Sequence, residues 1–220
     1  VYNQYFDFSL PQSGIKEDTP FWAGPAVFNA LRCESLLDAV ESIIGDEIFS
    51  NPIQHVRIKV PEAEAPRDEN GMVKFGATPW HQDAGVATEE VDNTNMLTVW
   101  FPLMDASEEN GCLQVVPGSH EGKVLTHCPG FNPKTGKLVQ GLAAGGLQIP
   151  TTLFQSEDAM PIPMKKGDAL FLTKKTIIKL VRTIKGIQNI NDINLSKKNI
   201  IFKTINQFPF ISVICKINCH

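Results

Sequence analysis

The chain of 220 residues has an apolar content of 42% and a net charge of −4, which suits one globular domain with a substantial core. No stretch approaches the ~18 continuous apolar residues of a membrane span, no secretory signal opens the chain, and its end is not the peroxisomal signal Ser-Lys-Leu. The five cysteines are scattered and odd in number, so we expect free thiols in the cytoplasm or another reducing intracellular compartment.

The N-terminal third predicts one helix and one strand. The sequence opens at Val1 rather than Met, so we expect a preceding piece to be missing. Apolar residues recur at helical spacing over 26–44, and Gly45 suits the position just past a helix end. Residues 55–60 alternate as a strand does, and the charged, proline-bearing segment 61–70 after them predicts a surface loop.

The segment Trp80-His81-Gln82-Asp83 carries the most informative chemistry. In an extended strand, residues two apart share a face, so the His81 imidazole and the Asp83 carboxylate should project together while Gln82 points away. A histidine and a carboxylate that converge suit a divalent metal, as in the 2-His-1-carboxylate sites of non-haem iron oxygenases. Residues 84–93 should form a loop that overhangs this site and helps to select substrate.

A second strand is predicted over 95–104, where Met96, Thr98 and Trp100 would face the site and the alternate residues would pack outward. Asn110-Gly111 is a strong hairpin turn signal, and 112–116 would be the returning strand.

The second half of the chain predicts a long loop followed by another strand. Residues 121–150 are rich in Gly and Pro and are expected to form a lid or substrate loop. A strand should follow Gly167-Asp168, over 169–173. Short strands that alternate with turn signals favour a sandwich or jelly roll, without an internal repeat or a second domain.

Three motifs in order carry a family resemblance: TPWHQDAG at 78–85, ENGCLQVVPGSH at 109–120 and KGDALFL at 166–172. Over about 56–173 the sequence resembles the phytanoyl-CoA dioxygenase family of Fe(II)- and 2-oxoglutarate-dependent oxygenases. The resemblance implies a mainly β fold, a double-stranded β-helix (a cupin-like jelly roll) with a flanking N-terminal helix, incomplete or altered at the C-terminus.

The same resemblance implies the site residues. His81 and Asp83 correspond to metal ligands and catalytic residues, and Trp100 corresponds to a residue that lines the 2-oxoglutarate pocket. Thr98 is a further candidate for binding the co-substrate carboxylate, as is Thr78. Enzymes of this family use Fe(II) and 2-oxoglutarate to hydroxylate a small organic molecule, and they release succinate and carbon dioxide.

The family pattern stops near residue 173. Its second histidine should follow the 169–173 strand, but Ile178 or a close neighbour stands in that position, and Arg182 comes too early for the family arginine. Residues 1–173 carry 11 Lys and Arg against 23 Asp and Glu, a net of −12, whereas 174–220 carry 9 against 1, a net of +8. We therefore expect 1–173 to be a single jelly-roll domain and 174–220 to be a basic tail that is not the native continuation.

The remaining histidines are weaker ligand candidates. His120 suits a turn or a role beside the ligands, and His127 should face solvent in the lid. His55 should lie at the surface or beside the ligands. His220 is terminal and would have to fold back to reach the site.

Three functional hypotheses remain. The first is an Fe(II)/2-oxoglutarate-dependent dioxygenase that acts on a small molecule, weakened or inactive in this form because one ligand is missing. The second is a non-catalytic jelly-roll binding module with a decayed metal site. The third, a nucleic-acid binder, rests only on the basic tail, and neither nucleic acid nor a membrane is expected as a partner.

Overall fold

A computed structural model describes residues 29–58, 78–87, 93–131, 147–181 and 211–219, together with residues 63, 67 and 136. For 51–58 and 211–219 only the backbone is described. The strands form two four-stranded sheets and one two-stranded sheet, in which all pairs are antiparallel. The protein is mainly β, as the sequence predicts. No helix in these described ranges is long and apolar enough to cross a membrane.

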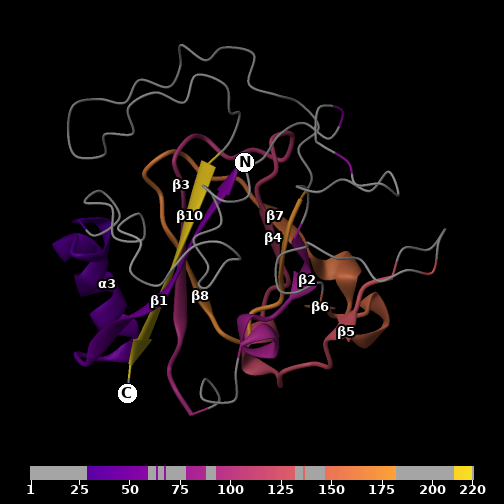
Figure 1. Cartoon of the computed structure of the whole chain (residues 1–220), viewed down its shortest axis with the longest axis horizontal. Helices are drawn as coiled ribbons and strands as arrows, with labels where there is room; N and C mark the ends of the chain where they lie inside the picture. The colour runs from indigo at the N-terminus through magenta and orange to yellow at the C-terminus, as the bar shows by residue number, and fades with distance from the viewer. Residues whose placement is uncertain are drawn as a thin grey trace.

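The first sheet has the strand order β1 (Ile48–Ile58), β10 (Ile211–Cys219), β3 (Leu97–Pro102), β8 (Leu170–Thr173). The second has the order β2 (Thr78–His81), β9 (Ile178–Leu180), β4 (Leu113–Val115), β7 (Met160–Ile162). The small sheet pairs β5 (Cys128–Pro129) with β6 (Leu147–Gln148). In Figure 1 the first sheet lies beside α3 (Glu34–Ile44), and β5 and β6 lie on the opposite side of the molecule.

The main core lies where the two large sheets meet. Trp100 and Leu172 of the first sheet join one buried cluster with Leu113, Ile178 and Leu180 of the second. The other face of β3 buries Leu97 and Val99 against Val40 of α3. The predicted alternation along this strand is therefore confirmed, because Trp100 lies in one cluster whereas Leu97 and Val99 lie in another.

The predicted helix over 26–44 is interrupted. Residues 29–31 are helical, but Cys33 is extended, and α3 begins only at Glu34. Residues 26–28 lie outside the described ranges. The predicted end is confirmed: Gly45 has φ 98° and donates its backbone N–H to Glu41 O at 2.9 Å.

The strand predicted to begin at residue 55 begins earlier, at Ile48. Its pairing with β10 is interrupted between Ser50 and Gln54, on either side of Pro52. Proline has no backbone N–H to donate, so it is tolerated in a strand at such an irregularity. The predicted strand end at 59–60 and most of the loop at 61–70 lie outside the described residues.

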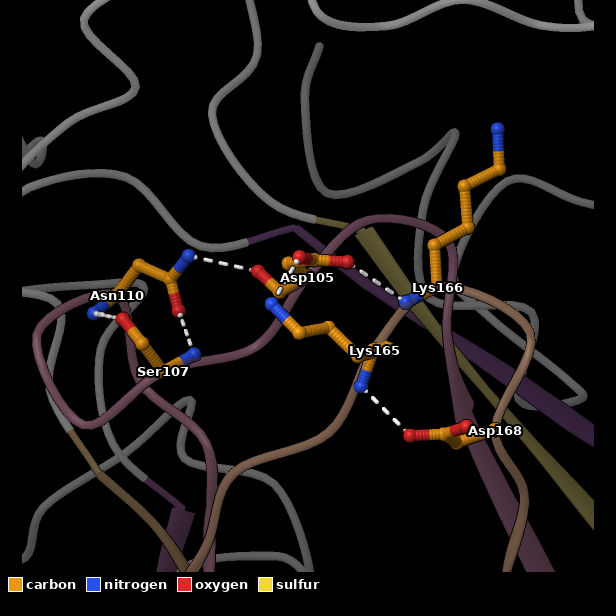
Figure 2. Close-up of polar contacts among 6 residues, drawn as sticks. All are labelled: Asp105, Ser107, Asn110, Lys165, Lys166 and Asp168. Carbon is orange, nitrogen blue, oxygen red and sulfur yellow. Dashed lines mark hydrogen bonds and ion pairs between the residues drawn. The ribbon is translucent and has the colours of Figure 1, made fainter.

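The predicted hairpin at Asn110-Gly111 is wrong. Gly111 has the positive φ of a tight turn, 91°, but β3 and β4 belong to different sheets. The turn therefore carries the chain from one sheet to the other. The Asn110 amide holds this corner by donating to Asp105 O at 2.8 Å (Figure 2).

Asp105 also links the corner to the segment before β8. Its carboxylate accepts the Lys165 ammonium at 2.8 Å and the Lys166 backbone N–H at 2.9 Å (Figure 2). The Lys166 ammonium points away from this group in the same view. These contacts join two connections about 60 residues apart at the exposed rim of the two sheets.

Both ends of the predicted lid are anchored. Residues 128–129 and 147–148 form the small sheet, and Ile149 N donates to Trp80 O at 2.7 Å. Residues 132–135 and 137–146, between these ends, lie outside the described residues.

The sheet continues past the predicted boundary at residue 173. β9 pairs with both β2 and β4, and it buries Ile178 and Leu180 in the main core. Ile177 is buried beside Trp80 in a third cluster. Residues 174–181 are thus integrated into the fold, whereas residues 182–210 and 220 lie outside the described ranges.

Candidate metal centre

The metal motif lies at the end of β2. His81 is the last residue of that strand, and Asp83 begins a 3-10 helix, Asp83–Val86, that occupies the start of the predicted loop 84–93. Both side chains are buried, and His81 Nε2 lies 3.8 Å from Asp83 Oδ1. Asp83 is not on the strand, but the extended Gln82 between them still brings the two groups together.

The tautomer of His81 follows from its other ring nitrogen. Nδ1 lies 2.8 Å from the carbonyl oxygen of Pro79. A carbonyl only accepts, so Nδ1 carries a proton, and Nε2 is the ring nitrogen that remains for a metal. A backbone acceptor of this kind is typical of histidines that bind metals, because it fixes the ring and directs the other nitrogen.

Thr98 holds the carboxylate from β3. Its hydroxyl donates to Asp83 Oδ2 at 2.5 Å, and Thr98 is only 1% exposed. The second carboxylate oxygen, Oδ1, is the one nearer His81 Nε2. The sequence analysis predicted Thr98 as a co-substrate contact. In the structure, its hydroxyl instead orients the Asp83 carboxylate.

Gln82 is a functional candidate that the sequence analysis passed over. It is fully buried, and its side chain donates to Lys123 O at 3.2 Å and Lys175 O at 2.6 Å. It also accepts Leu125 N at 2.8 Å. The sequence held no signal for these partners beyond the position of Gln82 between the two predicted ligands.

The residue that pairs with His81 across the second sheet is apolar. Ile178 on β9 is the cross-strand partner of His81, and it is 6% exposed. Over the ranges that the structure describes, no three His, Cys, Asp or Glu side chains gather closely enough to hold a metal. The pair His81 and Asp83 supplies an imidazole nitrogen and a carboxylate oxygen, which fit two positions of a non-haem iron site.

The other predicted histidines have different roles. The His120 side chain is 51% exposed, and its Nε2 lies 3.9 Å from Glu121 Oε1. His127 does not simply face solvent: it is half-buried, and Nε2 accepts the Gln82 backbone N–H at 3.0 Å. His220 and the side chain of His55 lie outside the described residues.

The two tryptophans near the motif are both buried. Trp100 is 1% exposed in the main core, in the same cluster as Ile178. Trp80 makes an edge-to-face contact with Phe154, with ring centroids 5.4 Å apart, and the Lys179 ammonium lies 5.1 Å from a Trp80 ring centroid. The apolar walls beside His81 are thus formed by both large sheets and by the segment after β6. Thr78, the other co-substrate candidate, is buried on β2 opposite Leu180.

Sequence comparisons find relatives among oxygenases. A probable alpha-ketoglutarate-dependent hypophosphite dioxygenase of Stutzerimonas stutzeri is 31% identical over 111 residues, which are 48% of this chain and 35% of that protein. A probable phytanoyl-CoA dioxygenase of Caenorhabditis elegans is 22% identical over 166 residues, 75% of this chain and 48% of that protein. The chain spans less than half the length of either relative.

Solved structures share the fold. EvdO2 from Micromonospora carbonacea var. aurantiaca, complexed with 2-oxoglutarate, has a TM-score of 0.55 at 20% identity, over 92% of this chain and 61% of that one. EctD from S. alaskensis, with 2-oxoglutarate and 5-hydroxyectoine, has a TM-score of 0.56 at 14% identity, over 90% and 53%.

The family follows from a match that covers most of the chain. The sequence model described as phytanoyl-CoA dioxygenase (PhyH) matches residues 24–177. This range contains the His81–Asp83 motif and the Asn110-Gly111 corner, and it continues to the start of β9. The chain belongs to the phytanoyl-CoA dioxygenase family.

Proposed function

We propose that this chain is the core of an Fe(II)- and 2-oxoglutarate-dependent dioxygenase that hydroxylates a small organic molecule on a jelly-roll scaffold. The observation that carries the proposal is the pair His81 Nε2 and Asp83 Oδ1, which lie 3.8 Å apart in a buried site. Family membership and the fold shared with 2-oxoglutarate-bound structures support the same reading.

Each residue of the pair has a definite role in this proposal. His81 would bind the metal through Nε2, because Pro79 O holds the proton on Nδ1. Asp83 would bind through Oδ1, because Thr98 occupies Oδ2. Trp100 would form part of the apolar wall that keeps water from the reacting groups. The bound iron supplies the oxidising chemistry, and the protein supplies position and a dry site.

The test is an anaerobic titration of the protein with Fe(II) in the presence of 2-oxoglutarate. Binding of both should give the weak visible absorption of the metal–2-oxoglutarate chelate. His81→Ala should abolish this band, whereas His120→Ala should keep it, because His120 is exposed and has no contact with the motif among its described partners. A folded wild-type protein without a band would contradict the proposal.

A second candidate function, a non-catalytic jelly-roll binding module, is favoured by one observation. Ile178 fills the cross-strand position beside His81 with a buried apolar side chain. Loss of one protein ligand weakens metal binding, because each ligand adds affinity and orientation. The titration separates the two functions, since a module with a decayed site would stay folded and show no band.

We also propose that residues 174–220 are not the native continuation of the chain. The missing second histidine after β8 and the net charge of +8 over 174–220 support this proposal, whereas the pairing of β9 and β10 with strands of the two large sheets opposes it. Sequencing the transcript across this region tests the idea. An uninterrupted frame shared with homologous transcripts would contradict it.

A further inference from the structure

The segment 123–127 is hydrogen-bonded directly to the metal motif. The side-chain amide of Gln82 donates to Lys123 O and accepts the backbone N–H of Leu125. The backbone N–H of Gln82 donates to His127 Nε2. These partners lie more than 40 residues further along the chain. The peptide between His81 and Asp83 is thus fixed by a distant part of the chain.

The His127 ring has a defined tautomer in this contact. Nδ1 lies 2.8 Å from Leu125 O, which only accepts, so Nδ1 carries the proton. Nε2 is then an acceptor, and it receives the Gln82 backbone N–H at 3.0 Å. The neutral imidazole therefore links the 123–127 segment to the motif through two hydrogen bonds in line.

Gly85 makes room for this ring. A Cβ placed on Gly85 would overlap the ring atoms of His127, and Gly85 does not have the positive φ that would by itself require glycine. The glycine is therefore needed for close approach. Without it, the imidazole could not reach Gln82 N along the same path.

The opposite side of the motif is held by the turn between β8 and β9. Gln82 Nε2 donates to Lys175 O at 2.6 Å, and Ala84 N donates to Lys174 O at 2.9 Å. The backbone from His81 to Ala84 is thus held between two segments. His127 accepts the backbone N–H of Gln82, the residue between the two proposed ligands.

We propose that His127 is a positioning residue of the metal pair, seated on Gly85 and fixing the Gln82 peptide so that His81 Nε2 and Asp83 Oδ1 stay at binding separation. This inference rests on the proposed function. The partners that hold metal ligands in place typically contribute ~10–100-fold to metal affinity. Loss of the His127 acceptor should therefore weaken metal binding by about tenfold without unfolding the protein.

The experiment uses the whole chain, with Mn(II) as a redox-stable probe whose free-ion electron paramagnetic resonance signal falls on binding. His127→Phe keeps a planar ring but removes the acceptor, so we expect the Kd for Mn(II) to rise about tenfold. His127→Gln places an amide oxygen near the position of Nε2 and should restore most of the affinity. His120→Phe is the matched control, since His120 is an exposed histidine of the neighbouring turn.

A second measurement does not depend on the metal. Hydrogen exchange of the Gln82 amide should be faster in His127→Phe and close to wild type in His127→Gln. Gly85→Ala should also speed this exchange, because it displaces the ring while the imidazole is retained. Unfolding temperatures of the metal-free variants show whether each change is local.

The outcomes separate this inference from the proposed function. If His127→Phe bound Mn(II) as tightly as the wild-type protein does, the positioning role alone would be overturned. Wild-type protein that binds no Mn(II) would overturn the proposed function. Unchanged exchange of the Gln82 amide in His127→Phe would overturn the anchoring contact, with or without metal.

Discussion

Ile178 on β9 is the cross-strand partner of His81 on β2, so an apolar side chain stands beside the proposed metal ligand. Directly opposed residues in an antiparallel pair have Cβ atoms ~4.5–5.5 Å apart and share a face. Ile178→His should therefore place a second imidazole next to His81. We expect the variant to bind Mn(II) or Fe(II) at least about tenfold more tightly than the wild type, as judged from the metal-dependent rise in unfolding temperature.

Leu180→His is the matched control for this gain. Leu180 lies on the same strand with similar burial, but its partner is Thr78 rather than His81. It should lose stability, as any buried apolar-to-polar change does, without gaining metal affinity. Equal gains in both variants would mean that the added histidine binds metal without His81.

Thr98→Val tests how the carboxylate is held. Valine keeps the branched shape but removes the hydroxyl that donates to Asp83 Oδ2. Loss of a hydrogen bond to a charged group costs ~1.5–3 kcal/mol, and we expect a fall of this size in the free energy of unfolding of the metal-free protein. Thr98→Ser retains the hydroxyl and should recover most of the loss in denaturant titrations. Equal losses in both variants would point to packing of the methyl group instead.

The sequence predicted features that depend on local periodicity. Alternation along β3 placed Trp100 and Val99 on opposite faces correctly, and Gly45 marked the end of α3. The Asn110-Gly111 turn was misread as a hairpin because a turn signal does not specify which sheet the next strand joins. His127 was misplaced for a related reason: its partner Gln82 is 45 residues away, beyond any local pattern.

The change in charge composition at residue 174 does not coincide with a change in the fold. The change in charge begins at residue 174, but Ile177 and Ile178 are buried in two different clusters. Net charge reports on the surface and on partners rather than on the fold. The backbone contacts of Lys174 and Lys175 with the motif could not be read from the charges of their side chains.

Val40→Ala tests the packing of α3 on β3. Val40 is fully buried and contacts the cluster of Leu97 and Val99. Removing two methyl groups there should lower the free energy of unfolding by ~2 kcal/mol through lost burial and a small cavity. Ile43→Ala is the control on the same helix, since Ile43 is 50% exposed, and it should change stability much less in the same denaturant titration.

Asp105→Asn tests the ion pair at the rim of the sheets. The Lys165 ammonium, and then the Lys166 backbone N–H, lower the pKa of the Asp105 carboxyl, while Asp105 raises the pKa of Lys165. The carboxylate therefore stabilises the fold above its ordinary pKa of about 4, and this contribution is lost as the pH falls through the lowered folded-state pKa. The Lys165 ammonium stabilises the fold below the ordinary pKa of lysine. This stabilisation is lost as the pH rises through its raised folded-state pKa.

The difference in unfolding temperature between wild type and Asp105→Asn should thus be greatest and flat around neutral pH. Both side chains are mostly exposed, so solvent screens the pair, and we expect a difference of at most about 3 °C. It should shrink in strong acid, in strong base and in high salt. Glu108→Gln, which removes a carboxylate from the same corner and has no described contact with Lys165, is the control. A difference that stayed constant from acid to neutral pH would mean that the ionised carboxylate of Asp105 contributes nothing to stability.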